Sequence, residues 1–144
     1  LVAYCGAPHV SKDINGQWVR QFIAGKYRRK WEEICSITQK FIDAMTALNY
    51  EEAAGCMNRE VALRREMTPD VFDEEGEQLR VSAVENTCGV RFTGAGGGGC
   101  VWALGAMEDI DRLKGIWENI LRQRNDARIL DSCVDKKGVI AKII

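Results

Sequence analysis

Five of the six consecutive residues 94–99 are glycine, and this run constrains the fold more than any other feature of the sequence. It lies between two short apolar segments, 89–93 and 100–104, that are typical of strands. Such a density of glycine is costly, because glycine loses more backbone freedom on folding than other residues do. Its use is geometric, since glycine allows a positive φ angle and lets bare backbone approach a ligand or another loop closely. We therefore predict two strands joined by a glycine loop.

Hydrophobic periodicity predicts helices before and after this pair of strands. Apolar residues recur at three- and four-residue steps over 27–48, which is the clearest helical pattern in the chain. Thr68 is expected to cap a further helix that has Pro69 as its first residue and runs to about 86. Other helices are expected at 18–24, 51–66 and 108–124.

Short apolar segments at 1–5, 128–134 and 138–143 are typical of strands, and a turn sequence over 135–138 joins the last two. The order along the chain is then strand, helices, two strands, helix and strand, followed by one more strand. This order predicts an α+β fold of ferredoxin-like type, with a split βαβ antiparallel sheet and extra helices in the first crossover. The helices should cover one face of the sheet.

The size and charge of the chain limit its class of partner. Its 144 residues suffice for one domain, and 20 Lys and Arg nearly balance 21 Asp and Glu. A near-neutral chain has no broad attraction to nucleic acid or to an anionic membrane, so neither is expected as a partner. The chain opens on strand-like residues without an initiator Met or a signal peptide, so we interpret it as part of a longer protein.

The cysteines do not form a recognisable metal or disulfide pattern. No CxxC pair occurs and there is a single histidine, whereas a structural zinc site needs several ligands at close spacing. We expect no metal site and free, mostly buried thiols in a reducing cytoplasm. The six cysteines are Cys5, Cys35, Cys56, Cys88, Cys100 and Cys133.

The glycine run does not fit two common nucleotide motifs. Gly94, Gly96 and Gly99 formally satisfy GxGxxG, but a dinucleotide motif must open a helix and the residues that follow here are strand-like. No Gly-Lys-Ser/Thr follows at the spacing of a P-loop. A flexible hairpin without a ligand remains an alternative. The length of the run, the hydroxyl of Thr93 and the cation of Arg91 on the same strand face favour a phosphate-binding role.

Residues 91–100, Arg-Phe-Thr-Gly-Ala-Gly-Gly-Gly-Gly-Cys, resemble the third motif of the galactokinase, homoserine kinase, mevalonate kinase and phosphomevalonate kinase superfamily, the GHMP kinases. The opening segment, 4–11, resembles the first strand and turn of the C-terminal domain in bacterial sugar and heptose kinase-like members, although Cys5 and His9 depart from that pattern. The resemblance implies that 1–144 is a GHMP C-terminal domain. The family's main phosphate loop, general base and Mg²⁺ ligand would lie in a separate N-terminal kinase domain.

The resemblance also implies a function and a site. The full enzyme would transfer phosphate from ATP, with Mg²⁺, to a small-molecule sugar or sugar phosphate, and residues 1–144 alone would be inactive. The amides of Gly94, Ala95, Gly96 and Gly97 would approach the γ-phosphate, Thr93 would brace the loop, and Arg91 would add positive potential or form a salt bridge on the sheet face. Ser11 and Asp13 would reach a sugar hydroxyl or cap a helix. The residues assigned to the phosphate side are Arg91, Thr93, Gly94, Ala95, Gly96, Gly97, Gly98 and Gly99.

A function of a different class is also compatible with the sequence. Many ferredoxin-like domains are non-catalytic modules that bind a small ligand or hold an assembly together. In that case the glycine loop would serve stability or assembly and not phosphoryl transfer.

Overall fold

A computed structural model describes residues 1–7, 11–135, 137 and 140–141, without the side chains of 11–13. Within these ranges four strands form one antiparallel sheet: β1 (Val2–Tyr4), β2 (Gly89–Phe92), β3 (Cys100–Leu104) and β4 (Arg128–Leu130). Their order across the sheet is β2-β3-β1-β4, so β3 lies between the two strands that the first crossover connects. This order confirms the predicted split βαβ fold.

The last strand is shorter than the sequence predicts. β4 ends at Leu130 because its partner β1 has only three residues, and their pairing runs from Tyr4–Arg128 to Val2–Leu130. The further strand predicted over 138–143 falls mostly outside the described residues, and residues 140 and 141, which are described, are not in a strand.

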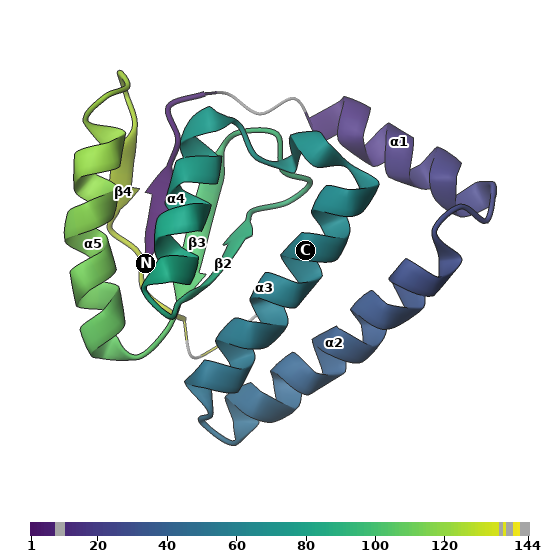
Figure 1. The fold of residues 1–144 in the computed structure, drawn as a ribbon, viewed down its shortest axis with the longest axis horizontal. Helices are drawn as coiled ribbons and strands as arrows, with labels where there is room; N and C mark the ends of the chain where they lie inside the picture. The colour runs from purple at the N-terminus through teal and green to yellow at the C-terminus, as the bar shows by residue number, and fades with distance from the viewer. Residues whose placement is uncertain (8–10, 136, 138–139, 142–144) are drawn as a thin grey trace.

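One face of the sheet is covered by α4 (Glu74–Glu85) and α5 (Met107–Leu121), which lie side by side in front of the strands (Figure 1). Leu113, Trp117 and Leu121 of α5 are buried, as the periodicity of that helix predicts. The indole Nε1 of Trp117 donates to the Leu79 carbonyl and to Ser82 Oγ, both at 3.1 Å, so the largest core side chain leaves no unpaired polar atom. The same core contains Ala3, Cys5, Leu79, Ala83, Cys88, Val90, Val101 and Ala103.

The free edge of β2 is covered by α3 (Tyr50–Met67), which runs along it (Figure 1). The side chain of Asn58 replaces a neighbouring strand: its Oδ1 accepts from the Val90 amide at 3.1 Å, and its Nδ2 donates to the Cys88 carbonyl at 3.0 Å. An open strand edge would pair with other chains, and this amide satisfies its backbone groups instead.

The first crossover contains two further helices, both before α3 in the chain. α2 (Arg28–Thr46) packs along α3, and α1 (Ser11–Ile23) precedes it. Ile34 and Ile37 of α2 are buried, whereas Ile42 and Leu48, which the periodicity places on the same apolar side, are exposed. Ile42 is exposed because α3 covers only a narrow stripe of α2, and Leu48 lies beyond the end of that helix.

The helix predicted from Thr68 to 86 is divided into two elements. Pro69–Val71 form one 3-10 turn, and α4 begins only after Asp73, whose side chain accepts from the Gly76 amide at 2.9 Å. Thr68 makes no side-chain cap; its hydroxyl accepts a hydrogen bond from Trp18 Nε1 at 2.8 Å. The predicted N-cap at Thr68 is therefore wrong, because Asp73 provides a better cap five residues later.

Two further findings concern the whole described chain. All six cysteines are free, as predicted, but only Cys5 and Cys88 are buried, so the prediction of mostly buried thiols is wrong. No helix among the described residues is both long and apolar enough to span a membrane.

The packing of α3 on β2 leaves no room at Gly89 and ample room at Gly55. A Cβ at Gly89 would lie 2.6 Å from Ala54 Cα, whereas a Cβ at Gly55, on the exposed side of the same helix, would meet nothing within 4 Å. We predict that Gly89→Ala lowers the free energy of unfolding by about 1–3 kcal/mol through overpacking. Gly55→Ala should raise it by about 0.5–1 kcal/mol, because alanine is the better helix former.

Urea unfolding of both variants, followed by circular dichroism, measures the two effects. Equal effects on stability would contradict the described contact between α3 and β2.

Candidate functional site

The glycine loop connects β2 to β3 in a backbone conformation that other residues rarely adopt. Its φ angles are +62° at Gly94, +83° at Gly96, +78° at Gly97, +112° at Gly98 and +79° at Gly99. L-residues with a Cβ are strained in this region. The density of glycine is therefore required by the shape of the loop.

Two neighbouring segments fix the loop through backbone hydrogen bonds. The Gly97 amide donates to the carbonyl of Val71, in the 3-10 turn, at 2.8 Å. The Gly99 amide donates to the carbonyl of Ala7, between β1 and α1, at 3.1 Å, and the Cys5 amide donates to the Gly99 carbonyl at 2.8 Å. The loop is thus held between the start of the first crossover and the turn that joins α3 to α4, and it is not a free hairpin tip.

Gly96 is the position at which the loop comes closest to its surroundings. A Cβ there would lie 2.4 Å from the Val71 carbonyl oxygen and 3.0 Å from Phe92 Cδ2. No side chain fits at that distance. The absence of a side chain at Gly96 is what allows the loop to reach Val71.

Thr93 closes the base of the loop. Its amide donates to the Cys100 carbonyl at 2.9 Å, and its hydroxyl donates to the same carbonyl at 3.1 Å. The hydroxyl bond is the kind of contact that a residue bracing the loop would make. It also occupies the hydroxyl proton, so Thr93 contributes to the shape of the loop more directly than to a ligand.

The loop amides differ in whether they have acceptors. Gly96 donates to the Thr93 carbonyl at 3.3 Å and Gly97 donates to Val71, so both amides are engaged within the protein. The amides of Gly94, Ala95 and Gly98 find no acceptor among the described residues. Gly94 is exposed, whereas Ala95 and Gly98 are buried, so an incoming anion would meet Gly94 first. Successive backbone N–H groups in such a turn form a concave site that favours anions.

Arg91 does not contribute to this arrangement of amides. Its guanidinium forms an ion pair with Glu60 of α3, at 3.0 Å from Nε to Oε2, and donates to the Phe92 carbonyl at 3.1 Å. The structure thus shows the salt bridge on the sheet face, which was one of the two alternatives for Arg91.

The opening segment lies beside the loop, but its side chains are only partly described. Ser11 and Asp13 belong to the first turn of α1, and their side chains fall outside the described residues, as does all of His9. Ala7, which precedes this gap, is the residue that binds Gly99. The hydrogen bond from Gly99 to Ala7 therefore links the glycine loop to the chain four residues before α1 begins.

The surroundings of the loop on the β1 side are acidic. Burial, and then the nearby carboxylate of Asp73, raise the pKa of the Cys5 thiol to about 12. Cys5 therefore stays protonated at neutral pH and is not a nucleophile. Arg124 pairs with both Asp73, at 3.1 Å, and Glu75, which leaves one carboxylate charge in excess in this cluster.

Sequence reasoning did not identify Val71 and Ala7, the two residues whose carbonyls hold the loop. A backbone carbonyl carries no signal in the sequence, because any residue can supply it. The glycine at 96 was the only available sign that some segment passes very close to the loop.

Within the described ranges, no group of three or more His, Cys, Asp and Glu side chains could hold a metal ion.

Comparison with known proteins identifies solved structures that share this fold. The phosphomevalonate kinase of Streptococcus pneumoniae, solved in complex with phosphomevalonate and AMPPNP, matches 91% of this chain with a TM-score of 0.76 and 18% identity. The Lin0012 protein from Listeria innocua matches 83% of it with a TM-score of 0.70 and 18% identity. No family model and no curated protein matches the sequence.

The chain spans 37% and 36% of the lengths of these two structures. At 18% identity the likeness shows a shared fold and nothing more. The fold of the chain is therefore shared with part of a phosphomevalonate kinase.

Proposed function

We propose that this chain is the C-terminal domain of an ATP-dependent small-molecule kinase of the GHMP type. The observation that carries the proposal is the glycine loop, which is anchored on both sides while the amides of Gly94, Ala95 and Gly98 have no acceptor among the described residues. The fold shared with a phosphomevalonate kinase supports it. An N-terminal kinase domain would face this loop and complete the active site.

The chemistry of phosphoryl transfer suits a loop of this kind. Catalysis of this reaction depends mainly on positioning and on stabilising negative charge on the transferred group. Preorganised backbone amides do this without reorganising during the reaction. The loop would place Gly94 and Ala95 against the transferred phosphoryl group, while Thr93 and Gly97 hold the shape of the backbone.

ATP and Mg²⁺ are the cofactors of the proposed enzyme. Mg²⁺ would neutralise charge on the phosphates, and we assign its ligands, and the general base, to the N-terminal domain. The loop itself offers neutral hydrogen-bond donors, and Arg91 is engaged by Glu60. The cations that bind the ATP phosphates are therefore also assigned to the other domain.

For the phosphate acceptor we propose a chemical class and not a single compound. The resemblance of the opening segment, 4–11, to sugar and heptose kinase-like members favours a sugar or sugar phosphate, with Ser11 and Asp13 on the substrate side. The structural neighbour was solved with phosphomevalonate, so a phosphorylated non-sugar acceptor is the competing choice. We place the enzyme in the cytoplasm, where ATP is available and free thiols are stable.

A substrate screen with the full-length protein tests the proposal. We expect ATP-dependent phosphorylation of one member of a panel that contains galactose, a heptose phosphate, mevalonate and phosphomevalonate, detected by a coupled assay for ADP. The isolated residues 1–144 should show no turnover, because the ATP site lies on the other domain. Failure of the full-length protein to turn over ATP with any acceptor would favour the non-catalytic binding or assembly module.

A matched pair of glycine substitutions tests the role of the loop. Gly94 and Gly25 have similar φ angles, +62° and +69°, and a Cβ at either would meet nothing within 4 Å. Gly94→Ala and Gly25→Ala should therefore cost similar stability, about 1–2 kcal/mol from the left-handed backbone. We predict that only Gly94→Ala lowers kcat/KM, by at least about tenfold, because its methyl group would lie where the phosphate approaches.

Thermal unfolding and steady-state kinetics of the full-length variants measure the two effects separately. An equal loss of activity in both variants, or none in Gly94→Ala, would show that the exposed part of the loop does not meet the phosphate.

A further inference from the structure

A second candidate site lies on the face of the sheet opposite to α4 and α5. A cavity of about 310 Å³ opens there between α2, α3 and the strands β2 and β3. Its apolar part includes Ile37, Met57 and Trp102, and its charged part is formed by Glu60, Arg64 and Arg91. Trp102 and Arg91 are paired across the two strands, so they occupy the same face of the sheet. This volume falls within the range of small-molecule sites.

The charged part of the cavity carries one positive charge in excess. Glu60 accepts from Arg64 Nε at 2.7 Å and from Arg91 at 3.0 Å, so a single carboxylate serves two guanidinium groups. The side chains of Glu60 and Arg64 are only 10% and 11% exposed. Among the described residues that line the cavity, Glu60 is the only acid. The excess positive charge is therefore shared by a buried guanidinium and by the partly exposed one of Arg91, and an approaching anion would balance it.

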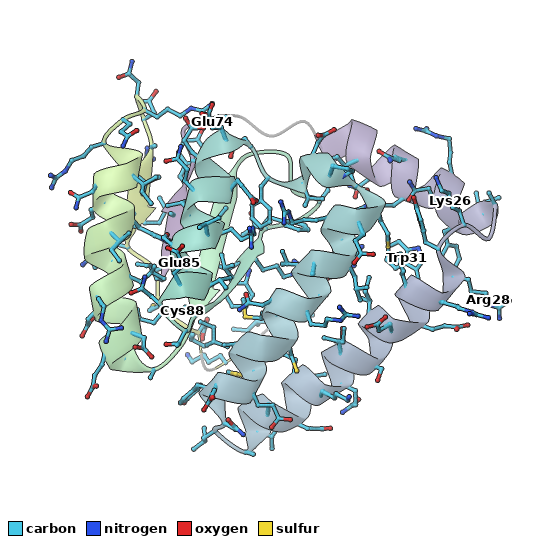
Figure 2. The ribbon with its side chains drawn as sticks, in the orientation of Figure 1. Lys26, Arg28, Trp31, Glu74, Glu85 and Cys88 are labelled. Atoms are coloured by element: carbon cyan, nitrogen blue, oxygen red, sulfur yellow. The ribbon has the colours of Figure 1, made fainter. Side chains whose placement is uncertain are left out.

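Arg64 is held in place by aromatic rings. Its guanidinium carbon lies 4.6 Å from the ring centre of Trp18 and 4.5 Å from that of Trp31. Trp31 projects from α2 toward α1 (Figure 2), and its ring meets that of Trp18 edge to face at 6.2 Å. The cation is therefore fixed before any ligand arrives, which reduces the entropy lost on binding.

Arg91 is the more accessible of the two cations. Its side chain is 27% exposed, and its guanidinium carbon lies 4.9 Å from the ring centre of Phe92. Its Nε and Nη2 donate to Glu60 and its Nη1 donates to the Phe92 carbonyl, so one N–H group of Nη1 and one of Nη2 remain for a ligand. An anion that enters the cavity would therefore meet Arg91.

We propose that this cavity binds a small molecule with an apolar body and a single carboxylate group. The apolar body would lie against Met57 and Trp102, and the carboxylate would pair with Arg91. A single negative charge balances the excess charge of the cluster, whereas a phosphate monoester, at about −1.5 to −2, would exceed it. The site is separate from the glycine loop, and the proposal does not depend on the kinase function.

Octanoate is a suitable probe, because it combines an alkyl chain with one carboxylate. Trp102 lines the cavity, so binding to the full-length protein should change the tryptophan emission with a saturable dependence on concentration. Octanamide and octylamine have the same chain without the negative charge, and octyl phosphate carries more of it. We expect octanoate to bind at least about tenfold more tightly than any of these three.

Two variants and a matched control assign the binding to the cavity. Arg91→Gln removes the excess charge and should weaken octanoate binding by at least about tenfold. Arg80→Gln also removes an arginine that pairs with a glutamate, Glu77 at 2.8 Å, but it lies on α4 away from the cavity and should leave the affinity unchanged. Thr38→Trp, at the margin of the cavity, should block binding without altering the ion pairs, so the test does not depend on the folding of Arg91→Gln alone.

Three results would overturn the proposal. The first is the absence of saturable octanoate binding at millimolar concentrations. The second is binding of octylamine or octanamide that equals the binding of octanoate, which would indicate adhesion to apolar surface only. The third is octanoate binding that survives Arg91→Gln or Thr38→Trp in variants whose circular dichroism is that of the original protein.

Discussion

The close contact between Gly96 and Val71 is the constraint on which the rest of the structure depends. Because the loop has no side chain at 96, its backbone reaches the 3-10 turn, and the Gly97 amide binds the Val71 carbonyl at 2.8 Å. That bond joins the turn between α3 and α4, inside the long first crossover, to the β2–β3 hairpin. Gly99 makes a second bond to Ala7 at the start of the crossover. The glycine loop is therefore held by two separate parts of the crossover, and its shape follows from these contacts.

Much of this arrangement could be predicted from the sequence, because the fold follows local patterns. The two strands around the glycines, the helices and the split βαβ order could be predicted from periodicity and from the run itself. The break at 68–73 could not, because Thr68-Pro69 and Asp73 are both acceptable helix starts and only tertiary contacts select between them. The hydroxyl of Thr68 binds Trp18, fifty residues away in the sequence.

The candidate site could be predicted in its location but not in its details. A motif shows that the backbone of 94–99 approaches something closely, but it does not show which amides are engaged inside the protein. Only coordinates show that Gly96 and Gly97 donate internally while Gly94 does not. The position of Arg91 follows from strand alternation, but its partner Glu60 lies on a helix thirty-one residues earlier. Tryptophans that look like core residues in the sequence also need coordinates, since Trp102 lines a cavity.

Strand β2 shows how one short segment serves two different surfaces. Val90 faces the core under α4 and α5, whereas Arg91 faces α3 and the cavity, because successive side chains of a strand point to opposite faces. The next residues, from Thr93, form the base of the glycine loop. Asn58 holds the free edge of the same strand through two hydrogen bonds. The rigid placement of β2 by α3 therefore positions both the loop and the charged end of the cavity.

The electrostatics of the loop bear on the proposal that a second domain completes the phosphate site. The loop offers neutral amides, Arg91 is paired with Glu60, and the cluster of Asp73, Glu75 and Arg124 on the β1 side carries an excess negative charge. Burial raises the pKa of the Cys5 thiol, and the carboxylate of Asp73 raises it further. Neutral donors in such surroundings orient a phosphate but do not supply the charge that holds a polyanion. Under the proposed function, the attraction would come from cations or Mg²⁺ on an N-terminal domain, so that this chain would contribute geometry to the reaction and the other domain would contribute charge.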